Sequence, residues 1–452
     1  MTPAVRRLVA ALTAEQLPAY VHDLAALRAH AAAVRAALPE RVELYYAAKA
    51  NPDAPVLAAL AGAVDGYEVS SGGEAAHLRA AVPGHPLAFG GPGKTPAEMA
   101  AVLASGVRRW HVESEHELRL LASMTSADPA RPAGPRSPAG PRSAAEREGA
   151  VGPTGPEGSG DSDGSGDPTE PDGAAGATGS TGASADGPVD VLLRVNLPVT
   201  DGSLDGVKLA MGGRPTPFGL DPAVVERCVR LLAEPGSGRL RLRGVHAHLA
   251  SGLDAEAQLA LAERVVEWSA ALAAEHGFPL HEVNVGGGMA VDYADPDARF
   301  DWTAFGKGLA ELLDRHPGLT LRIEPGRALT SYCGYYATEV LDVKQSHGED
   351  FAVVRGGTHH LRTPATRGHD QPFAVLPVEH WPHPWPRPAT TTGLVTVAGQ
   401  LCTPKDVLAA RQPVEVLRAG DRLVFAMAGA YAWNISHHEF LMHPHPGFHY
   451  LD

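Results

Sequence analysis

A regular alternation of short apolar segments and longer helical segments constrains the fold of this chain most strongly. The apolar segments are typical of β-strands, and the segments between them carry apolar residues at helical spacing. Strands that alternate with helices across short loops predict a parallel sheet covered by helices. About eight such units follow one another, the number that closes a (β/α)8 barrel of the TIM type. The predicted strands are 18–23, 42–46, 66–69, 86–90, 110–113, 189–195, 240–246, 282–285 and 319–324.

The alternation is interrupted once, at about residues 125–188. This stretch consists mainly of Gly, Pro, Ser, Ala and Asp, and it contains ten acidic residues against four arginines. A segment with so few large apolar residues cannot offset the entropy lost on ordering, so we predict that it is disordered. Because a strand pattern resumes at residue 189, the stretch is an insertion within one domain and does not separate two domains.

After residue 327 the pattern changes to β-rich runs separated by proline and glycine loops, at 335–344, 351–355, 394–398 and 422–427. These runs predict a second, mainly β domain, of the barrel or sandwich type. We therefore expect three parts. They are an N-terminal segment of residues 1–19 that packs with the β domain, the barrel over 20–327, and the β-rich domain over 328–452.

The charge and the cysteine content exclude several classes of protein. A formal net charge of −14 argues against nucleic acid or an anionic membrane as the partner. The three cysteines, Cys228, Cys333 and Cys402, show no short spacing, which excludes a disulfide scaffold and a zinc site built from cysteine alone. No run approaches about twenty apolar residues, and the N-terminus lacks the features of a signal peptide. We expect a cytoplasmic protein that binds neither nucleic acid nor membranes.

Lysine is scarce in this chain, and Lys49 directly follows the apolar strand at 42–46. Burying a charged ammonium group is costly, so either its head reaches water or its pKa falls. An amine of lowered pKa can form a Schiff base with a carbonyl cofactor. The alternative for this stretch taken alone is a lysine that extends its head to solvent at the end of a strand.

Further polar motifs follow other predicted strands, at the end of the barrel where such folds place their sites. Gly286, Gly287 and Gly288 could bring backbone N–H groups close to a phosphate, or they could form a simple turn. Glu324 could pair with a pyridine nitrogen and Arg327 with a phosphate, or the two could form a local ion pair.

The histidines do not predict a metal site. His246 and His248 alternate along one strand and could share a face, but no third ligand is evident nearby. A histidine that lies flat on an aromatic cofactor fits this pattern as well. In the C-terminal tail, Glu439 and His443 are too far apart for the HExxH motif of zinc proteases. We expect the tail to pack against the protein or to line a pocket.

Taken in order, these motifs resemble the fold-type III pyridoxal-phosphate decarboxylases, the family of ornithine and diaminopimelate decarboxylases. The ordered set extends over nearly the whole chain apart from the insertion, and it is far more specific than any one of its members. The matching segments are Tyr46-Ala47-Ala48-Lys49-Ala50-Asn51, Glu68-Val69-Ser70-Ser71-Gly72-Gly73-Glu74, His246-Ala247-His248-Leu249-Ala250-Ser251-Gly252, Gly286-Gly287-Gly288, Glu324-Pro325-Gly326-Arg327, Leu401-Cys402-Thr403 and Gly429-Ala430-Tyr431.

The resemblance implies a role for each matching residue. Lys49 would bind pyridoxal 5′-phosphate as a Schiff base, Glu324 would pair with the pyridine nitrogen, and His248 would stack on the ring. Glu68 would lie near the Schiff base. Cys402 would reach across the interface of a homodimer and protonate the carbanion left when carbon dioxide departs. The phosphate would be held by Ser251, Gly286, Gly287, Gly288, Arg327 and Tyr431.

Two positions depart from the family pattern. Ala250 stands where a glycine usually precedes the phosphate-binding serine, a small change that still allows phosphate binding. Thr403 stands where an acidic residue commonly helps to bind the distal amine of the substrate. This second departure argues against free ornithine, lysine or diaminopimelate as the substrate.

Three further segments look like the branch of this family that acts in siderophore biosynthesis, whose members decarboxylate a citrate-linked diamino acid. They are Gly356-Gly357-Thr358-His359-His360, Cys402-Thr403-Pro404-Lys405-Asp406 and Gly429-Ala430-Tyr431-Ala432-Trp433-Asn434-Ile435-Ser436-His437-His438. We expect a small amino-acid-derived substrate similar to citryl-diaminopropionate. The alternatives are a diaminopimelate decarboxylase, a racemase of the same fold type, in which an arginine would replace Glu324, and a catalytically silent regulator like the antizyme inhibitors.

Overall fold

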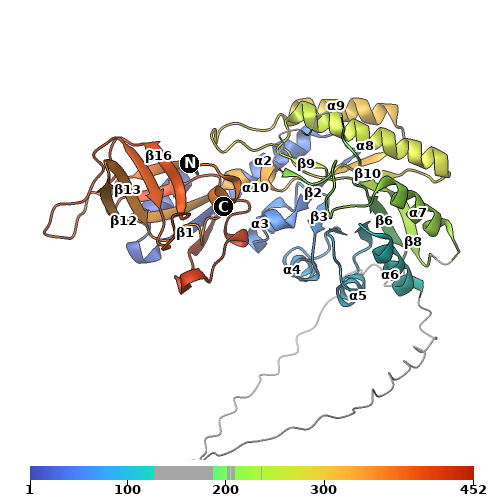
Figure 1. Ribbon diagram of the computed structural model, residues 1–452, viewed down its shortest axis with the longest axis horizontal. Coiled ribbons are helices and arrows are strands. Elements are labelled where there is room, and N and C mark those ends of the chain that lie inside the picture. The colour runs from blue at the N-terminus through green and yellow to red at the C-terminus, as the bar shows by residue number, and fades with distance from the viewer. Residues whose placement is uncertain (127–186, 201–203, 205–208, 236) are drawn as a thin grey trace, which may run out of the picture. The chain divides into compact units, whose positions relative to one another are not determined.

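The computed structural model describes residues 1–126, 187–200, 204, 209–235 and 237–452 (Figure 1). Eight parallel strands close a barrel in the order β10-β11-β2-β3-β4-β5-β6-β8, so the predicted barrel is confirmed. Its strands are β2 (Val42–Ala47), β3 (Gly66–Val69), β4 (Leu87–Phe89), β5 (Arg109–Val112), β6 (Val189–Arg194), β8 (Leu240–His246), β10 (Glu282–Asn284) and β11 (Thr320–Ile323).

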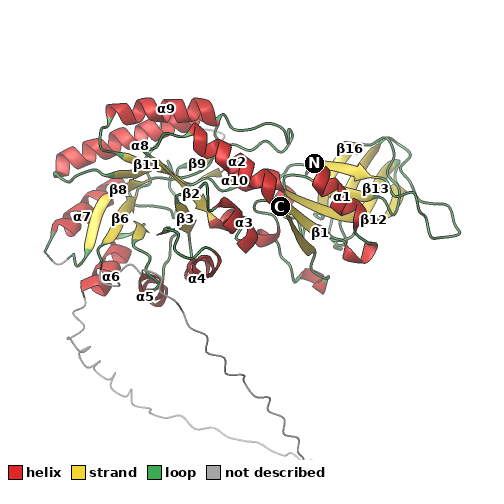
Figure 2. Ribbon diagram, turned by 180° about the vertical axis from the view of Figure 1, so that it is seen from behind, coloured by secondary structure: helices red, strands yellow, loops and turns green. Residues whose placement is uncertain are grey.

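The barrel strands are short and buried, as the continuous apolar runs in the sequence indicate. Helices follow most of the strands, and two of them, α8 and α9, run side by side on the outside of the barrel (Figures 1 and 2). The helices of this part are α2 (Leu24–Ala37), α3 (Ala54–Leu60), α4 (Gly72–Ala81), α5 (Pro96–Ala104), α6 (Glu115–Ser126), α7 (Pro222–Ala233), α8 (Ala255–His276), α9 (Trp302–Arg315) and α10 (Arg327–Thr330).

Side chains fix where these helices begin. Thr95 and Glu98 form a capping box at the start of α5, in which each side chain contacts the backbone of the other. Asp254 and Asp301 each accept a hydrogen bond from a backbone N–H group in the first turn of α8 and of α9. Each cap fixes the residue at which a loop ends and a helix begins. The loops that precede these three helices carry polar residues at the mouth of the barrel.

The register of the strands keeps their carboxyl ends level. Ala47 of β2 lies beside Glu68 of β3. Asn284 of β10 lies between His246 of β8 and Arg322 of β11. The residues at and after these positions therefore meet at one end of the barrel, which is where the sequence predicts the site.

Strand β1 (Ala19–Asp23) differs from the expectation that it opens the barrel series. It pairs with β12 (Gly334–Ser346) and β18 (Gly447–Leu451) in the second sheet. All five of its residues are buried, and a fully buried strand has the same sequence pattern in a barrel as in the middle of another sheet. Only the pairing partners, which lie more than three hundred residues away in the chain, distinguish the two.

The second sheet has eight strands, six of which run in the order β14-β17-β12-β13-β15-β16, while β1 pairs with β12 and β18. The β-rich domain expected after the barrel is therefore present. Val5 and Val9 of α1 (Pro3–Ala11) pack in one core cluster with Ala337 and Val424 of this sheet. The remaining elements are β13 (Glu349–Val354), α11 (Thr363–Arg367), β14 (Phe373–Leu376), β15 (Leu394–Ala398), β16 (Val407–Pro413) and β17 (Arg422–Phe425), with a two-stranded ribbon of β7 (Leu209–Ala210) and β9 (Ala250–Ser251) beside the barrel.

The insertion predicted at about 125–188 lies almost wholly outside the described residues. It joins α6 to β6, and β6 pairs with β5, so the chain enters and leaves the insertion within the barrel. The conclusion that it interrupts a single domain agrees with this connection.

The contact between α9 and α2 gives a test of the fold. A β-carbon on Gly306 would lie 1.9 Å from the carbonyl oxygen of Ala37, closer than any real contact. We expect Gly306→Ala to lower the free energy of unfolding by about 1–3 kcal/mol, measured by urea denaturation. Gly62→Ala is the control, because no heavy atom lies within 4 Å of a β-carbon there. Equal stability of the two variants would contradict this packing.

Candidate active site

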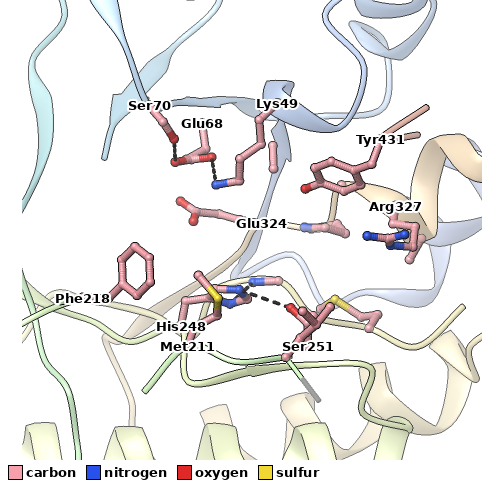
Figure 3. A pocket seen from close by; sticks show the side chains of 18 of the residues that line it. Lys49, Glu68, Ser70, Met211, Phe218, His248, Ser251, Glu324, Arg327 and Tyr431 are labelled. Carbon is pink, nitrogen blue, oxygen red and sulfur yellow. Dashed lines mark hydrogen bonds and ion pairs between the residues drawn. The ribbon is translucent and has the colours of Figure 1, made fainter. Parts of the chain in front are cut away.

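A cavity of about 430 Å³ opens at the carboxyl ends of the barrel strands, within the size range of small-molecule sites (Figure 3). It contains all but two of the residues that the sequence singles out. Gly286 and Cys402 do not line it, although Gly286 lies against the ring of His248. The residues that do line it are Lys49, Glu68, His248, Ser251, Gly287, Gly288, Glu324, Arg327 and Tyr431.

Lys49 lies in a single helical turn directly after β2 and extends its amine into the cavity. Its Nζ donates a hydrogen bond to Oε2 of Glu68 at 2.9 Å. Oε1 of Glu68 accepts a second hydrogen bond, from the hydroxyl group of Ser70 at 2.9 Å. Both carboxylate oxygens of Glu68 therefore accept a hydrogen bond, and Ser70 fixes the side chain that binds Lys49.

The pKa of Lys49 follows from this pair. Burial alone would lower the pKa of Lys49, but the charges of Glu68 and Glu324 outweigh burial and raise it above its ordinary value. Of the two alternatives in the sequence, a head group that reaches water is the one found, since 48% of the Lys49 side chain is exposed, and a lowered pKa is not found. Burial would likewise raise the pKa of Glu68, and Lys49 holds it below its usual value.

Arg327 and Tyr431 lie together at one end of the cavity (Figure 3). The guanidinium group of Arg327 lies 4.7 Å from the ring centre of Tyr431 and donates to the hydroxyl group of Tyr293 at 3.0 Å. Within the described residues, no carboxylate forms an ion pair with Arg327. A cation without a counterion at this end of the cavity favours an anionic group there.

The backbone of Tyr431 is in the left-handed region, with a φ of 49°, which is uncommon for a residue with a side chain. Two hydrogen bonds hold it there. Its N–H donates to the carbonyl oxygen of Ala50 at 2.8 Å, and its own carbonyl accepts from the hydroxyl group of Thr363 at 2.6 Å. The backbone of Tyr431 is thus hydrogen-bonded to the helical turn that contains Lys49.

The glycines after β10 are required by their surroundings. A β-carbon on Gly287 would lie 2.2 Å from the carbonyl oxygen of Glu324, and one on Gly288 would lie 2.2 Å from that of Ala250. Gly288 also has a φ of +99°. Only glycine lets the chain pass this close, so the concave surface beside Ser251 depends on the triplet.

The ring of His248 is oriented by two contacts. The N–H of Gly287 donates to Nδ1 at 3.3 Å, so Nδ1 carries a lone pair. The proton of the neutral ring is then on Nε2, which lies 3.4 Å from the hydroxyl oxygen of Ser251. Burial lowers the pKa of His248 to about 3, and Arg194 adds to this effect. His248 therefore presents a neutral ring to the cavity.

Glu324 is buried at the end of β11, where Oε1 accepts a hydrogen bond from Nδ2 of Asn284 at 2.7 Å. Burial and the charge of Glu68 raise the pKa of Glu324 to about 7. The pKa values of the two carboxyl groups in the cavity therefore differ, because Lys49 holds the carboxyl group of Glu68 ionised.

The sequence suggests His248 as the residue that could share a metal with His246, and the structure places other potential ligands beside His246. Its neighbours are His111 and Glu324, whose ligand atoms lie within 4.8 Å of its own, and not His248. The rings of His111 and His246 are 4.3 Å apart with planes tilted by 34°. The potential ligands that the sequence did not reveal near His246 are therefore His111 and Glu324.

Sequence reasoning missed Arg194, Asn284 and His111. Arg194 lines the cavity and forms a 2.6 Å ion pair with Glu113. Asn284 and Arg194 end β10 and β6, and His111 lies one residue before the end of β5. A polar residue near the carboxyl end of an otherwise apolar barrel strand is the signal that identifies all three.

Within the described part of the chain, no helix combines the length and the apolar character needed to cross a membrane.

A family model described as pyridoxal-dependent decarboxylase, C-terminal sheet domain, matches residues 19–429. The chain belongs to this family. Among its relatives is 2-[(L-alanin-3-ylcarbamoyl)methyl]-2-hydroxybutanedioate decarboxylase of Staphylococcus aureus, 33% identical over 453 residues, which cover 99% of this chain and 98% of that protein. A diaminopimelate decarboxylase of Actinosynnema pretiosum is 29% identical and covers 92% of this chain and 79% of its own.

Solved structures of the family share the fold of this decarboxylase. A point mutant of the diaminopimelate decarboxylase of Helicobacter pylori, complexed with L-lysine, has a TM-score of 0.72 at 20% identity, covering 96% of this chain and 90% of that one. The lysine/ornithine decarboxylase of Vibrio vulnificus complexed with putrescine has a TM-score of 0.71 at 17% identity, covering 100% and 99%. At these identities the likeness concerns the fold.

The residues of the cavity fit pyridoxal phosphate, the cofactor of the family. Arg327, which has no ion-pair partner in the described part of the chain, and the glycine surface beside Ser251 suit a phosphate group. Lys49 offers an amine that suits a carbonyl group, and Glu324 offers a carboxyl group that suits a ring nitrogen. The cofactor's three attachment points thus each have a chemically matched partner in one cavity.

Glu324 gives a prediction for stability. Its pKa in the folded protein, about 7, lies above the value of 4.5 expected without burial, so its favourable contribution is complete below about pH 4.5 and is lost as the pH rises through 7. We expect Glu324→Gln to stabilise the cofactor-free enzyme at pH 8, by up to about 3 kcal/mol. The gain should shrink toward pH 5, measured by urea denaturation across this pH range.

Glu43→Gln provides a control of opposite sign. The charges of Arg322 and Arg109 hold the pKa of Glu43 below its usual value despite burial. The loss of stability in Glu43→Gln should therefore grow as the pH rises from 4 to 6. A stability difference for Glu324→Gln that does not vary with pH would show that its carboxyl group does not ionise near neutrality.

Proposed function

We propose that this decarboxylase removes carbon dioxide from a diaminopropionate unit joined through an amide to citrate, a reaction of siderophore biosynthesis. The observation that carries the proposal is the full-length relative from Staphylococcus aureus, at 33% identity. The name of that relative describes an alanine unit, linked at its third carbon through a carbamoyl group to a hydroxybutanedioate. Such a substrate presents one α-amino acid to the cofactor and a polycarboxylate at its far end.

The charges of the cavity support a substrate without a distal amine. Its lining acids among the described residues are Glu68 and Glu324, and both are already engaged, with Lys49 and with Asn284. A distal ammonium group would find no free carboxylate on this wall. Thr403, where the family commonly has an acid, removes a second source of one.

Pyridoxal phosphate, when bound, supplies a ring that accepts the electron pair released with carbon dioxide. In the proposed mechanism Lys49 would hold the cofactor covalently until the amino group of the substrate takes its place. Glu68 would pair with the amine of Lys49 and keep it beside the reacting carbon. Glu324 would hold a proton on the pyridine nitrogen. His248 would pack on the ring with its neutral face, and the phosphate would be bound by Ser251, Gly286, Gly287, Gly288, Arg327 and Tyr431.

The acid that completes the reaction is proposed to come from a second copy of the chain. Cys402 is exposed and does not line the cavity of its own chain. In a homodimer with composite sites, Cys402 of the partner subunit would deliver the proton of its thiol to the α-carbon. Each chain would then provide the cofactor site for one reaction and the proton donor for the other.

The alternative substrate is diaminopimelate, favoured by the relative from Actinosynnema pretiosum. A silent regulator is disfavoured because Lys49 and Cys402 are both present.

We further propose that the enzyme acts in the cytoplasm and binds neither nucleic acid nor membranes. Its net charge of −14 and three unpaired cysteines support this placement.

The substrate proposal is tested by measuring carbon dioxide release from citryl-diaminopropionate and from diaminopimelate. We expect kcat/KM for the conjugate to be at least about 100-fold higher, a difference of about 2.7 kcal/mol in transition-state binding. Lys49→Ala should lose both activity and the visible absorbance near about 420 nm of a covalently held cofactor. A preference for diaminopimelate, or retention of that absorbance in Lys49→Ala, would contradict the proposal.

The composite site is tested by mixing two inactive variants, Lys49→Ala and Cys402→Ala. After exchange of subunits, a mixed dimer would contain one site with both residues intact, so about a quarter of the wild-type activity should return at equal amounts. If Cys402 served its own chain, every site in the mixture would lack one residue. No activity would then return, which would refute the shared site.

A further inference from the structure

The side-chain amide of Asn284 lies between two groups that matter to the ring-nitrogen end of the cavity. Its Nδ2 is 2.7 Å from Oε1 of Glu324 and 3.3 Å from Nε2 of His111. Asn284 is completely buried, so no solvent competes for these contacts. The orientation of one amide therefore influences both a carboxyl group and an imidazole.

A backbone group fixes this orientation. Oδ1 of Asn284 faces the N–H of Gly286 at 2.9 Å. A backbone N–H can only donate, so the amide atom that faces it must be the oxygen. The NH₂ group is then directed away from Gly286 and toward Glu324 and His111, and its two hydrogens match the two neighbours.

His111 must accept the second of these hydrogens on Nε2. A neutral imidazole that accepts on Nε2 carries its own proton on Nδ1. Burial first, and then the charge of Arg322, lowers the pKa of His111 well below its usual value, which agrees with a neutral ring. His111 is thereby restricted to one tautomer and cannot donate from Nε2 to Glu324, which lies 3.8 Å away.

His246 completes the surroundings of the carboxyl group. Its Nε2 lies 3.7 Å from Oε2 of Glu324, and neither ring nitrogen has a hydrogen-bond partner among the described residues. It stacks on His111 and is neutral for the same reason, since burial lowers its pKa well below the usual value. Of the three polar side chains around Glu324, only Asn284 donates to it at hydrogen-bond distance.

We infer that Asn284, oriented by the N–H of Gly286, is the positioning residue that fixes the carboxyl group of Glu324 for a ring nitrogen and locks His111 in its Nδ1–H tautomer. Asn284 does not line the cavity and acts through Glu324. The inference rests on the proposed role of Glu324 toward the cofactor. The predicted tautomer of His111, however, belongs to the cofactor-free protein and can be measured without any reaction.

The first test is the tautomer itself. Enzyme labelled with ¹⁵N-histidine and freed of cofactor is examined by long-range ¹H–¹⁵N correlation, and the signal of His111 is identified by its loss in His111→Gln. We expect a protonated Nδ1 and an unprotonated Nε2 that do not titrate between pH 6 and 8. A protonated Nε2, or a titrating ring, overturns the inference.

The second test is the isosteric variant Asn284→Asp. An aspartate still accepts from the N–H of Gly286, but it places an oxygen 2.7 Å from Oε1 of Glu324, so the two carboxyl groups must share a proton. We expect the dissociation constant of pyridoxal phosphate to rise about 10- to 100-fold at pH 8, the effect of losing a hydrogen bond to a charged group. In the same variant His111 should no longer be held to one tautomer.

His85→Phe is the matched control. His85 is partly buried, and one of its ring nitrogens has no hydrogen-bond partner among the described residues. It precedes β4, at the opposite end of a barrel strand from the site. The dissociation constant of pyridoxal phosphate from His85→Phe should equal that from the wild type. Circular dichroism verifies that His85→Phe and Asn284→Asp both fold. Unchanged cofactor binding in folded Asn284→Asp refutes the positioning role.

The two proposals fail separately. An enzyme that decarboxylates the citrate conjugate but shows the other His111 tautomer retains the proposed function and loses the inference. If the enzyme shows the expected tautomer and Asn284→Asp binds the cofactor more weakly, but the enzyme acts on diaminopimelate, the inference stands and the proposed substrate is wrong.

Discussion

The parallel hydrogen bonding that closes the barrel between β8 and β10 is the constraint on which the rest of the site depends. It places Asn284 directly beside His246, and the next strand places Arg322 on the other side. Glu324, two residues after Arg322, then lies within reach of the Asn284 amide. A shift of β10 by one residue would point Asn284 to the other face of the sheet and leave the buried carboxyl group of Glu324 without a donor.

Electrostatics then assigns different states to the two acids that line the cavity. Glu68 is held ionised by Lys49 and Ser70, whereas burial raises the pKa of Glu324 to about 7. The same residue type thus serves as the counterion of an amine in one place and as a carboxyl group close to its own pKa in the other. A ring nitrogen that carries a proton would favour the ionised form of Glu324 and offset part of its burial cost.

Much of this could be predicted from the sequence because it depends on local patterns. The bounds of β8 and the gathering of Lys49, His248 and Glu324 at one mouth follow from periodicity and from the geometry of a barrel. The position of β1 could not be predicted, since its partners are set by tertiary pairing. The raised pKa of Lys49 also required the structure, because it depends on the contact with Glu68 across two strands.

The segments that resemble the siderophore branch acquire a physical meaning in the fold. Asp406 is buried and accepts hydrogen bonds from the N–H and the hydroxyl group of Thr358, at 2.6 and 2.8 Å, and from the N–H of Leu401 at 2.8 Å. Gly357 lies so close to this carboxylate that a β-carbon there would be 2.6 Å from its oxygens. The residues on either side of Cys402 are therefore tied to the Gly356–His360 segment. These hydrogen bonds suit the proposed role of Cys402 as a proton donor, because a donor on a mobile loop would lose the alignment that proton transfer requires.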